Sequence, residues 1–270
     1  MLAAQRRELI LEQVRRTGAV RVTDLVERLG VSDMTVRRDL DALESRGELR
    51  KVHGGAVAPA GASTEEPGFE AKSTLQVAEK HAIAREVARL VEPGSAIGLS
   101  AGTTPSIIAE YLRDVPGLTV VTNSLRVADV FHRSARTDQT VALTGGFRTP
   151  SDALVGPIAL RSVHDLHLDL LLLGVHGMHE RAGFTTPNLM EAEMNRALVE
   201  ASRSLIVAAD HTKWGTVGIS TMAPLDRCDV LVSDAGLEAA AREVLAEHVG
   251  ELVIAEAAGG GAEDEERTGR

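Results

Sequence analysis

The sequence predicts an α/β protein in which an N-terminal winged helix-turn-helix domain precedes a larger α/β domain with a mostly parallel sheet. Residues 1–58 hold three short helical patterns followed by a hairpin pattern. Beyond residue 68, short β-rich runs alternate with helical stretches, as they do in parallel βαβ units. The length of 270 residues also exceeds what one core usually organises, which favours two domains.

The composition indicates a folded chain in a reducing compartment. Hydrophobic residues make up 44% and charged residues 25%, which excludes a wholly disordered or fibrous chain. Aromatic residues make up only 2%, which disfavours stacking on single-stranded nucleic acid. The single Cys228 cannot form an intrachain disulfide. The longest aliphatic run, residues 170–173, is far shorter than the roughly 20 residues of a membrane helix. Residues 1–16 carry charges throughout, unlike a signal peptide. We expect a cytoplasmic protein without a membrane partner.

Charge is distributed unevenly along the chain. Residues 1–58, the head, hold eleven Lys and Arg against nine Asp and Glu, a balance of +2. Because the whole chain carries −10, the remainder carries −12. Such asymmetry indicates a head that binds a polyanion and an acidic body, although chance variation on a solvated surface is the alternative.

The head reads as three helices and a hairpin. Apolar periodicity predicts helices over residues 5–16 and 22–29. Ser32 is a good N-cap for a third helix that ends at Arg46-Gly47. Alternation over residues 48–57 predicts the hairpin. The third helix buries one apolar face, made by Val36, Leu40 and Leu43.

Residues 59–68, rich in Ala, Pro, Gly, Ser and Glu, read as a linker, and residues 69–256 form the body. Residues 257–270, with a glycine run and clustered acidic residues, read as a disordered tail. The body's predicted strands are 96–99, 118–122, 141–144, 168–174, 205–209, 230–233 and 252–255. Its predicted helices are 77–91, 105–112, 124–132, 189–202 and 237–248.

The third helix of the head is the candidate DNA-reading element, because the second helix of a helix-turn-helix unit enters the major groove. With 100° per residue, the face opposite the core is centred on Arg38 and flanked by Met34. We expect Thr35 and Arg38 to approach bases. The expected phosphate contacts are Arg37 and Ser32 on the helix and Arg50, Lys51 and His53 on the hairpin. The alternative is that these basic residues are solvated surface charges without a role in DNA binding.

The head resembles the DNA-binding signature of the DeoR family of bacterial transcription regulators. The resemblance rests on residues 30–44, GVSDMTVRRDLDALE, and on residues 52–56, VHGGA. It spans the whole predicted first domain and is far more specific than a bare helix-turn-helix. It implies double-stranded operator DNA as a partner.

Several strand-to-helix turns in the body suit an anion. Residues 96–105 run from a strand through Gly102, Thr103 and Thr104 into a helix, whose first N–H groups and dipole attract negative charge. Gly145-Gly146, residues 174–177 and residues 209–213 also follow predicted strands. Ligands of open α/β sheets bind outside the carboxyl ends of the strands. Taken singly, each turn could merely cap the helix that follows it.

The body also resembles DeoR proteins, whose corresponding domain is similar to ribose-5-phosphate isomerase and binds a phosphorylated sugar or related metabolite. The matching pieces include Glu79-Lys80, residues 122–124, 144–146, 154–157 and 210–213. The family often carries other residues where Ser100 and His176 stand, and both positions would face the ligand. The resemblance places around the ligand Lys80, Gly102, Thr103, Thr104, Asn123, Glu191 and Lys213. The lysines would bind phosphate, whereas Asn123 and Glu191 would bind hydroxyls.

Three functions fit these patterns: a ligand-responsive transcription factor, a sugar-phosphate isomerase or acyl-transfer enzyme with a fused head, and an architectural DNA binder. An isomerase needs a carboxylate base, and residues 174–178 lack the acidic cluster of the related isomerases. An architectural role does not account for the anion-binding edge. We therefore expect a non-enzymatic repressor, released by a phosphorylated sugar and acting as a homo-oligomer (dimer or tetramer). We expect no metal, because the histidines lack ligand spacing, and no cofactor.

Overall fold

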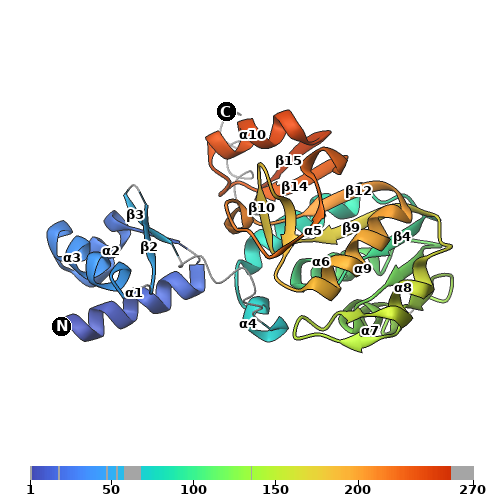
Figure 1. Cartoon of the computed structure of the whole chain (residues 1–270), viewed down its shortest axis with the longest axis horizontal. Coiled ribbons are helices and arrows are strands. Elements are labelled where there is room, and N and C mark those ends of the chain that lie inside the picture. Colours follow the sequence, from blue (N-terminus) through green and yellow to red (C-terminus); the bar gives the residue numbers. More distant parts are fainter. Residues whose placement is uncertain are drawn as a thin grey trace, which may run out of the picture. The chain divides into compact units, whose positions relative to one another are not determined.

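The computed structural model describes residues 2–17, 19–46, 48–52, 54–57, 68–134 and 136–256 (Figure 1). The described elements fall into two compact units, α1 to β3 in the head and α4 to β15 in the body. The predicted tail, the predicted linker apart from Gly68, and His53 lie outside the described residues. The domain boundaries inferred from the sequence therefore stay predictions.

The head has the predicted three helices and hairpin. Its helices are α1 (Ala3–Thr17), α2 (Val22–Leu29) and α3 (Asp33–Glu44), and its strands are β1 (Ala19–Arg21), β2 (Arg50–Val52) and β3 (Gly55–Val57). The strand β1 was not expected, because three residues carry no alternation signal. It pairs antiparallel with β3, which also pairs with β2, so β3 is the central strand of a three-stranded sheet.

Local sequence signals set the start of α3. The Ser32 hydroxyl accepts a hydrogen bond from the Thr35 backbone N–H at 3.3 Å, which satisfies one of the unpaired donors of the first turn. Val36, Leu40 and Leu43 are buried in the head's core, as their periodicity predicted.

A buried carboxylate joins α3 to α1. Asp39 is only 2% exposed, and its two oxygens accept hydrogen bonds from Arg6 Nε at 2.8 Å and Arg7 Nε at 2.9 Å. Two of the eleven basic residues of the head thus serve its own packing. Because one carboxylate receives both guanidinium groups, the orientation of α3 on α1 depends on Asp39.

The body is built on a seven-stranded sheet in which every neighbouring pair is parallel. The strand order is β15-β14-β12-β9-β4-β5-β6. The seven strands predicted from the sequence are these strands, with bounds that differ by at most three residues. The strands are β4 (Ala96–Leu99), β5 (Thr119–Thr122), β6 (Thr140–Leu143), β9 (Leu168–Gly174), β12 (Ser202–Ala208), β14 (Val230–Asp234) and β15 (Glu251–Ala255).

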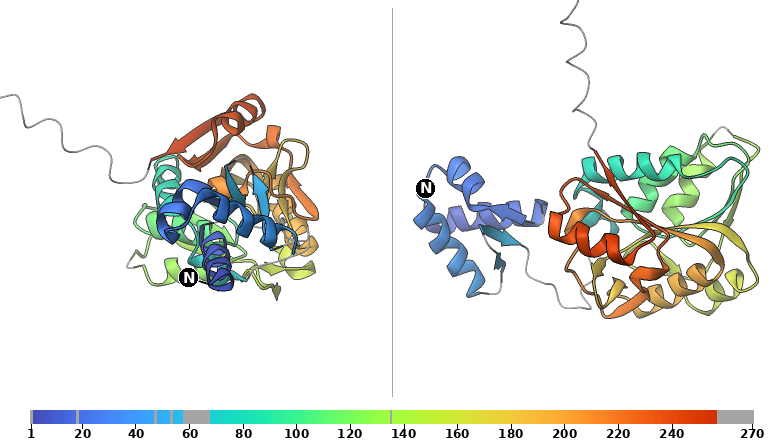
Figure 2. Two further views of the ribbon diagram at one scale, coloured as in Figure 1. Left: turned by 90° about the vertical axis from the view of Figure 1, so that its left-hand side faces the viewer. Right: turned by 90° about the horizontal axis from the view of Figure 1, so that it is seen from above.

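Helices cover both faces of this sheet (Figures 1 and 2). Alternation along β9 separates the two cores, because Leu171 and Leu173 belong to one buried cluster and Leu172 to the other. One face carries α5 (Val77–Arg89), α6 (Thr103–Leu112) and α7 (Leu125–His132). The other carries α8 (Pro157–Val163), α9 (Leu189–Glu200) and α10 (Ala239–His248). Within the described residues, no helix has the length and apolar character needed to cross a bilayer.

Smaller elements that the sequence did not predict complete the body. A short helix, α4 (Phe69–Ser73), precedes α5. The two-stranded ribbon is β7 (Phe147–Arg148) with β8 (Leu154–Val155). The antiparallel three-stranded sheet is β10 (Gly177–His179), β11 (Gly183–Thr186) and β13 (Ser220–Ala223), and the 3₁₀ turns are η1 (His211–Lys213) and η2 (Leu225–Arg227).

We expect Asp39→Ala to lower the free energy of unfolding of the head by about 2 to 3 kcal/mol, because it leaves two partly buried arginines without their partner. The matched variant Asp33→Ala removes an exposed ion pair with Arg37 and should cost no more than about 1 kcal/mol. Hydrogen exchange of the α3 amides measures the head separately from the body. Equal losses in the two variants would contradict the role of Asp39.

Candidate functional site

A pocket lies at the carboxyl ends of three neighbouring strands in the middle of the sheet. The segments after β4 and β9 contribute residues 101–105 and 174–176, and the turn after β12 contributes Lys213. The pocket has a volume of about 610 Å³, which includes space open to solvent at its mouth. The remaining lining residues are Lys72, Ser151, Thr186, Pro187, Glu191, Asn195 and Met222. This is the edge at which open α/β sheets bind ligands.

One wall of the pocket is the start of α6. Gly102 is the N-cap residue, with φ of +134°, and no side chain caps the first turn. Its lack of a side chain allows that positive φ. Thr103 and Thr104 in the first turn line the pocket. Uncapped N–H groups, hydroxyls and the positive end of the helix dipole together suit an anion.

Two lysines add positive charge to this wall. Lys72 Nζ donates a hydrogen bond to Ser151 Oγ at 2.8 Å, and both side chains line the pocket. Lys213 Nζ lies 3.8 Å from Asp210 Oδ2, an oxygen that is buried and accepts no hydrogen bond within the described residues. The Lys213 ammonium group therefore lies beyond hydrogen-bonding distance of its acidic neighbour.

Glu191 supplies a carboxylate on another side of the pocket. It lies in the first turn of α9, where the Asn188 side chain accepts hydrogen bonds from the Met190 and Glu191 N–H groups. Its Oε1 accepts a hydrogen bond from Thr149 Oγ1 at 2.5 Å. Glu191 is the one carboxylate among the lining residues, and carboxylate oxygens are acceptors for hydroxyl groups.

Lys80 is buried behind the pocket. It is 3% exposed, and its Nζ donates a hydrogen bond to the Lys72 carbonyl at 2.6 Å. Burial, aided by the positive charges of Lys213 and Lys72 and opposed by Asp210, lowers the pKa of Lys80 to about 8. Nearby, the hydrogen bond to Asp234 raises the pKa of His211.

The structure brings together six of the eleven predicted effector-binding residues. These are Gly102, Thr103, Thr104, His176, Glu191 and Lys213. The lining does not include Lys80, Ser100, Asn123, Gly145 or Gly146. The assignment of the eleven as ligand contacts stays a prediction.

Ser100 and Asn123 lie beneath the pocket rather than in it. Ser100 is fully buried, and its Oγ accepts a hydrogen bond from the Gly174 N–H at 3.0 Å. Asn123 Oδ1 accepts from the Ala101 N–H at 3.1 Å, and its Nδ2 donates to the Leu154 carbonyl at 3.2 Å. Both side chains therefore position the loops that form the pocket.

Gly145 and Gly146 follow β6, which is one of the two edge strands of the sheet and is not a neighbour of β4, β9 or β12. A Cβ on Gly146 would lie 2.4 Å from the Val155 carbonyl oxygen, so this glycine permits close packing against β8. Lys72, Ser151, Thr186 and Asn195 line the pocket but were not predicted, because none directly follows a strand expected from the sequence; Thr186 ends β11, which was not predicted. Within the described residues, no group of three His, Cys, Asp or Glu side chains is placed to hold a metal ion.

The basic side chains on and beside the outward face of α3 differ in whether they pair with an acidic side chain. Arg38 is exposed and makes no hydrogen bond or ion pair within the described part of the chain. Arg37 Nε donates to Asp33 Oδ1 at 2.5 Å, and Lys51 Nζ on β2 pairs with Asp41. Arg38 is therefore the basic side chain of α3 that already points to solvent without a partner.

The other predicted DNA contacts lie at the start of α3 and on the hairpin. Ser32 Oγ and Thr35 Oγ1 share a hydrogen bond of 2.9 Å at the helix start, and Met34 is 62% exposed. The side chain of Arg50 and the whole of His53 lie outside the described residues. All the predicted contacts with DNA stay predictions.

Family models match both parts of the chain. Residues 6–61 match the DeoR-like helix-turn-helix domain, and residues 75–235 match the DeoR C terminal sensor domain. Together the two matches cover more than half of the sequence.

Curated relatives align along nearly the whole chain. An uncharacterised helix-turn-helix-type transcriptional regulator, YgbI of Escherichia coli (strain K12), is 35% identical over 94% of this chain and 99% of its own length. The glycerol-3-phosphate regulon repressor of the same strain is 32% identical over 92% of this chain and 97% of its own length. A putative aga operon transcriptional repressor of Escherichia coli O157:H7 is 32% identical over 93% of both chains. Among solved structures, a D-ribose-5-phosphate isomerase in complex with phospho-erythronic acid matches with a TM-score of 0.38 and 16% identity, over 50% of this chain and 52% of its own.

The lowered pKa of Lys80 predicts a pH-dependent stability. Between the folded value of about 8 and the ordinary value of 10.5, the unfolded chain holds a proton that the folded chain has lost, so stability rises with pH. Relative to Lys80→Met, the free energy of unfolding of the wild type should rise by about 3 kcal/mol across this interval. Urea unfolding followed by fluorescence of Trp214, the single tryptophan, measures it. A difference in unfolding free energy that stays constant from pH 8 to 10.5 would contradict the lowered pKa of Lys80 in the folded chain.

Proposed function

Because this chain belongs to the DeoR family of transcriptional regulators, we propose that it represses sugar-metabolism genes and that a phosphorylated sugar relieves the repression. In this proposal the head binds double-stranded operator DNA and the body binds the effector. The names of two relatives, the glycerol-3-phosphate regulon repressor and the putative aga operon repressor, support a role in such metabolism.

One observation carries the choice of effector: the pocket combines an anion-binding wall with a carboxylate. A phosphate group carries close to two negative charges at neutral pH. The α6 N-terminus, Lys72 and Lys213 supply the opposite charge, and Glu191 supplies an acceptor for sugar hydroxyls. A ligand with a phosphate and several hydroxyls fits both walls.

Arg38 supports the DNA-reading role of α3. A guanidinium group can donate two hydrogen bonds to one guanine, and Arg38 has no ion pair in the described residues to give up first. Arg37 and Lys51, which are paired with Asp33 and Asp41, suit phosphate contacts that set the position of the head on DNA.

The proposal includes a homo-oligomer, a dimer or a tetramer. Two heads can occupy two half-sites, and the effector then acts by changing their relative placement. A coupling free energy of about 1–3 kcal/mol between effector and DNA would change operator affinity some 5- to 150-fold, which suffices for a switch.

We also propose that this protein is not an enzyme. Aldose–ketose isomerisation needs a base and an accessory acid beside the reacting carbon atoms. Glu191 is the single carboxylate of the lining, and its Oε1 already accepts a hydrogen bond from Thr149. This arrangement favours binding of hydroxyl groups over proton transfer.

We expect Arg38→Ala to weaken binding to the operator by about 1–3 kcal/mol, because a base contact is lost. The operator is first obtained by selection from random-sequence duplex DNA. Gel shifts at physiological salt then compare the operator with a scrambled duplex. Lys51→Ala should weaken binding to both duplexes to the same extent. Unchanged operator affinity of Arg38→Ala would refute the assignment of the reading face.

We expect Lys213→Ala and Thr103→Val each to lower effector affinity about tenfold to a hundredfold. Each variant loses one contact with the charged phosphate group, worth about 1.5–3 kcal/mol. Operator affinity without effector should stay unchanged. Thermal shift and operator release are measured with a panel of D-ribose 5-phosphate, D-fructose 6-phosphate, D-glucose 6-phosphate and glycerol 3-phosphate.

Two matched controls accompany these variants. Arg203→Ala and Thr119→Val alter exposed residues near the amino ends of β12 and β5, at the far edge of the same sheet, and should leave the response intact. A wild-type protein that no panel member stabilises would refute the proposed effector class. A Lys213→Ala protein that keeps the wild-type response would refute the proposed site.

A further inference from the structure

The short helix α4 forms part of the effector pocket and is also the first described element of the body. Residues 58–67, between the head and the body, lie outside the described residues, and α4 begins at Phe69. Lys72 on α4 lines the pocket. Of the described parts of the body that line the pocket, α4 is therefore the one nearest in sequence to the head.

A five-residue turn connects α4 with Glu191, the carboxylate of the pocket. In residues 149–153, the Thr149 N–H donates to the Ala153 carbonyl at 2.9 Å, and the Asp152 N–H donates to the Thr149 carbonyl at 3.0 Å. Thr149 reaches Glu191, and Ser151 reaches Lys72. Both polar walls of the pocket are thus bonded to one turn.

Asp152 holds this turn in an unusual conformation. Its φ is +60°, a region that residues other than glycine rarely occupy, and the residue is 4% exposed. The carboxylate accepts hydrogen bonds from Arg148 Nε at 2.7 Å and Arg126 Nε at 2.8 Å. Such conformations persist when the surrounding contacts fix them, as the two arginines do here.

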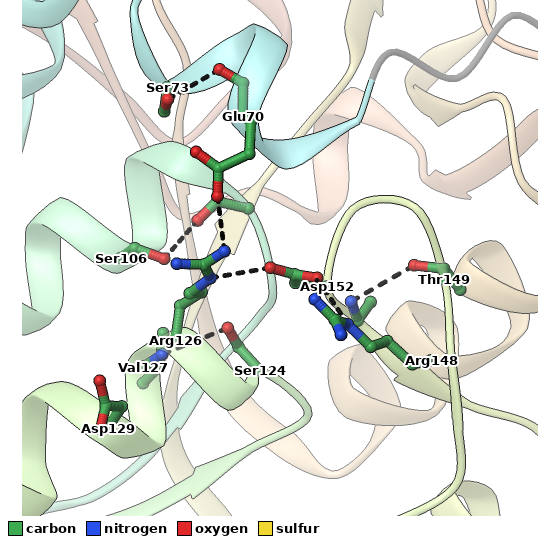
Figure 3. Close-up of polar contacts among 12 residues, drawn as sticks. Glu70, Ser73, Ser106, Ser124, Arg126, Val127, Asp129, Arg148, Thr149 and Asp152 are labelled. Atoms are coloured by element: carbon green, nitrogen blue, oxygen red, sulfur yellow. Dashed lines mark hydrogen bonds and ion pairs between the residues drawn. The ribbon is translucent and has the colours of Figure 1, made fainter.

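Arg126 connects the same turn to α4 (Figure 3). Its Nη2 donates to Glu70 Oε1 at 2.6 Å, and its guanidinium group lies 4.7 Å from the centre of the Phe69 ring. The Phe69 N–H donates to the Pro150 carbonyl at 3.0 Å. Arg126 itself does not line the pocket. Three groups of contacts therefore hold α4 on the turn: the Lys72–Ser151 hydrogen bond, the Arg126 contacts and the Phe69 backbone bond.

We propose that α4 is the element through which the body reports that its pocket is occupied, with Lys72 as a ligand contact and Arg126 as the residue that holds α4 on the turn at residues 149–153. The inference rests on the proposed sensing function. A phosphate attracts the Lys72 ammonium group more strongly than the neutral Ser151 hydroxyl does. Ligand binding thereby removes one of the three groups of contacts, and α4 shifts.

A fluorescent label on α4 tests the movement. Ala71→Cys places a thiol on the exposed side of α4, and the native Cys228 does not compete because it is buried and its pKa is raised to about 12. The matched control is Ala240→Cys, an exposed alanine on α10, which does not line the pocket. The full-length proteins carry an environment-sensitive maleimide dye and are titrated with the four phosphates of the panel.

The expected result is a change in emission from the label at position 71 and none at position 240, for the same phosphate that stabilises the protein. A phosphate that stabilises the protein but leaves the label at position 71 silent overturns the role of α4 while the proposed function stands. If none of the four stabilises the wild type, the proposed function fails, and this inference fails with it.

Substitution of Arg126 tests the coupling itself. Arg126→Gln weakens the contacts that hold α4 on the turn, so half-maximal operator release should need roughly 5- to 150-fold less phosphate. The control Arg133→Gln removes an exposed arginine near the end of α7, where it pairs with Asp129, and should behave as the wild type. Glu70→Gln, at an exposed side chain, tests the same link if Arg126→Gln does not fold. An unchanged or raised phosphate requirement in the folded variants overturns the proposal.

Discussion

The parallel direction of all seven strands is the constraint on which the effector pocket depends. It brings every strand's carboxyl end to one edge of the sheet. Because β4, β9 and β12 are neighbours in the middle of that sheet, their following segments lie together, although β4 and β12 are about a hundred residues apart in sequence. The start of α6, residues 174–176 and Lys213 meet only for this reason.

The pocket is polar because different elements supply its two kinds of charge. The α6 N-terminus and two lysines form the positive wall, while Glu191 at the start of α9 is the acidic group. The turn at residues 149–153 contacts both Lys72 and Glu191. A ligand that binds both Lys72 and Glu191 therefore changes two contacts of that turn, and α4 is the helix bonded to it.

In the head, several basic side chains pair with acidic side chains of the same domain. Its buried Asp39 binds Arg6 and Arg7, and the exposed Arg37 and Lys51 pair with neighbouring acids. These basic side chains are thus engaged within the domain. Sequence-specific DNA binding then depends on where individual side chains of α3 point, Arg38 above all, more than on the head's net charge.

Local sequence signals were sufficient for the seven strands of the large sheet, for most of the longer helices and for part of the site. The cap at Ser32, the buried face of α3, the seven parallel strands and the turn at Gly102 to Thr104 all follow from contacts within a few residues. Strand order does not, because it is decided by burial of side chains far apart in the sequence. Tertiary structure alone therefore placed Gly145 and Gly146 at the edge strand, turned Lys80 toward the Lys72 carbonyl, and brought Lys72 into the pocket from a helix too short to show any periodicity.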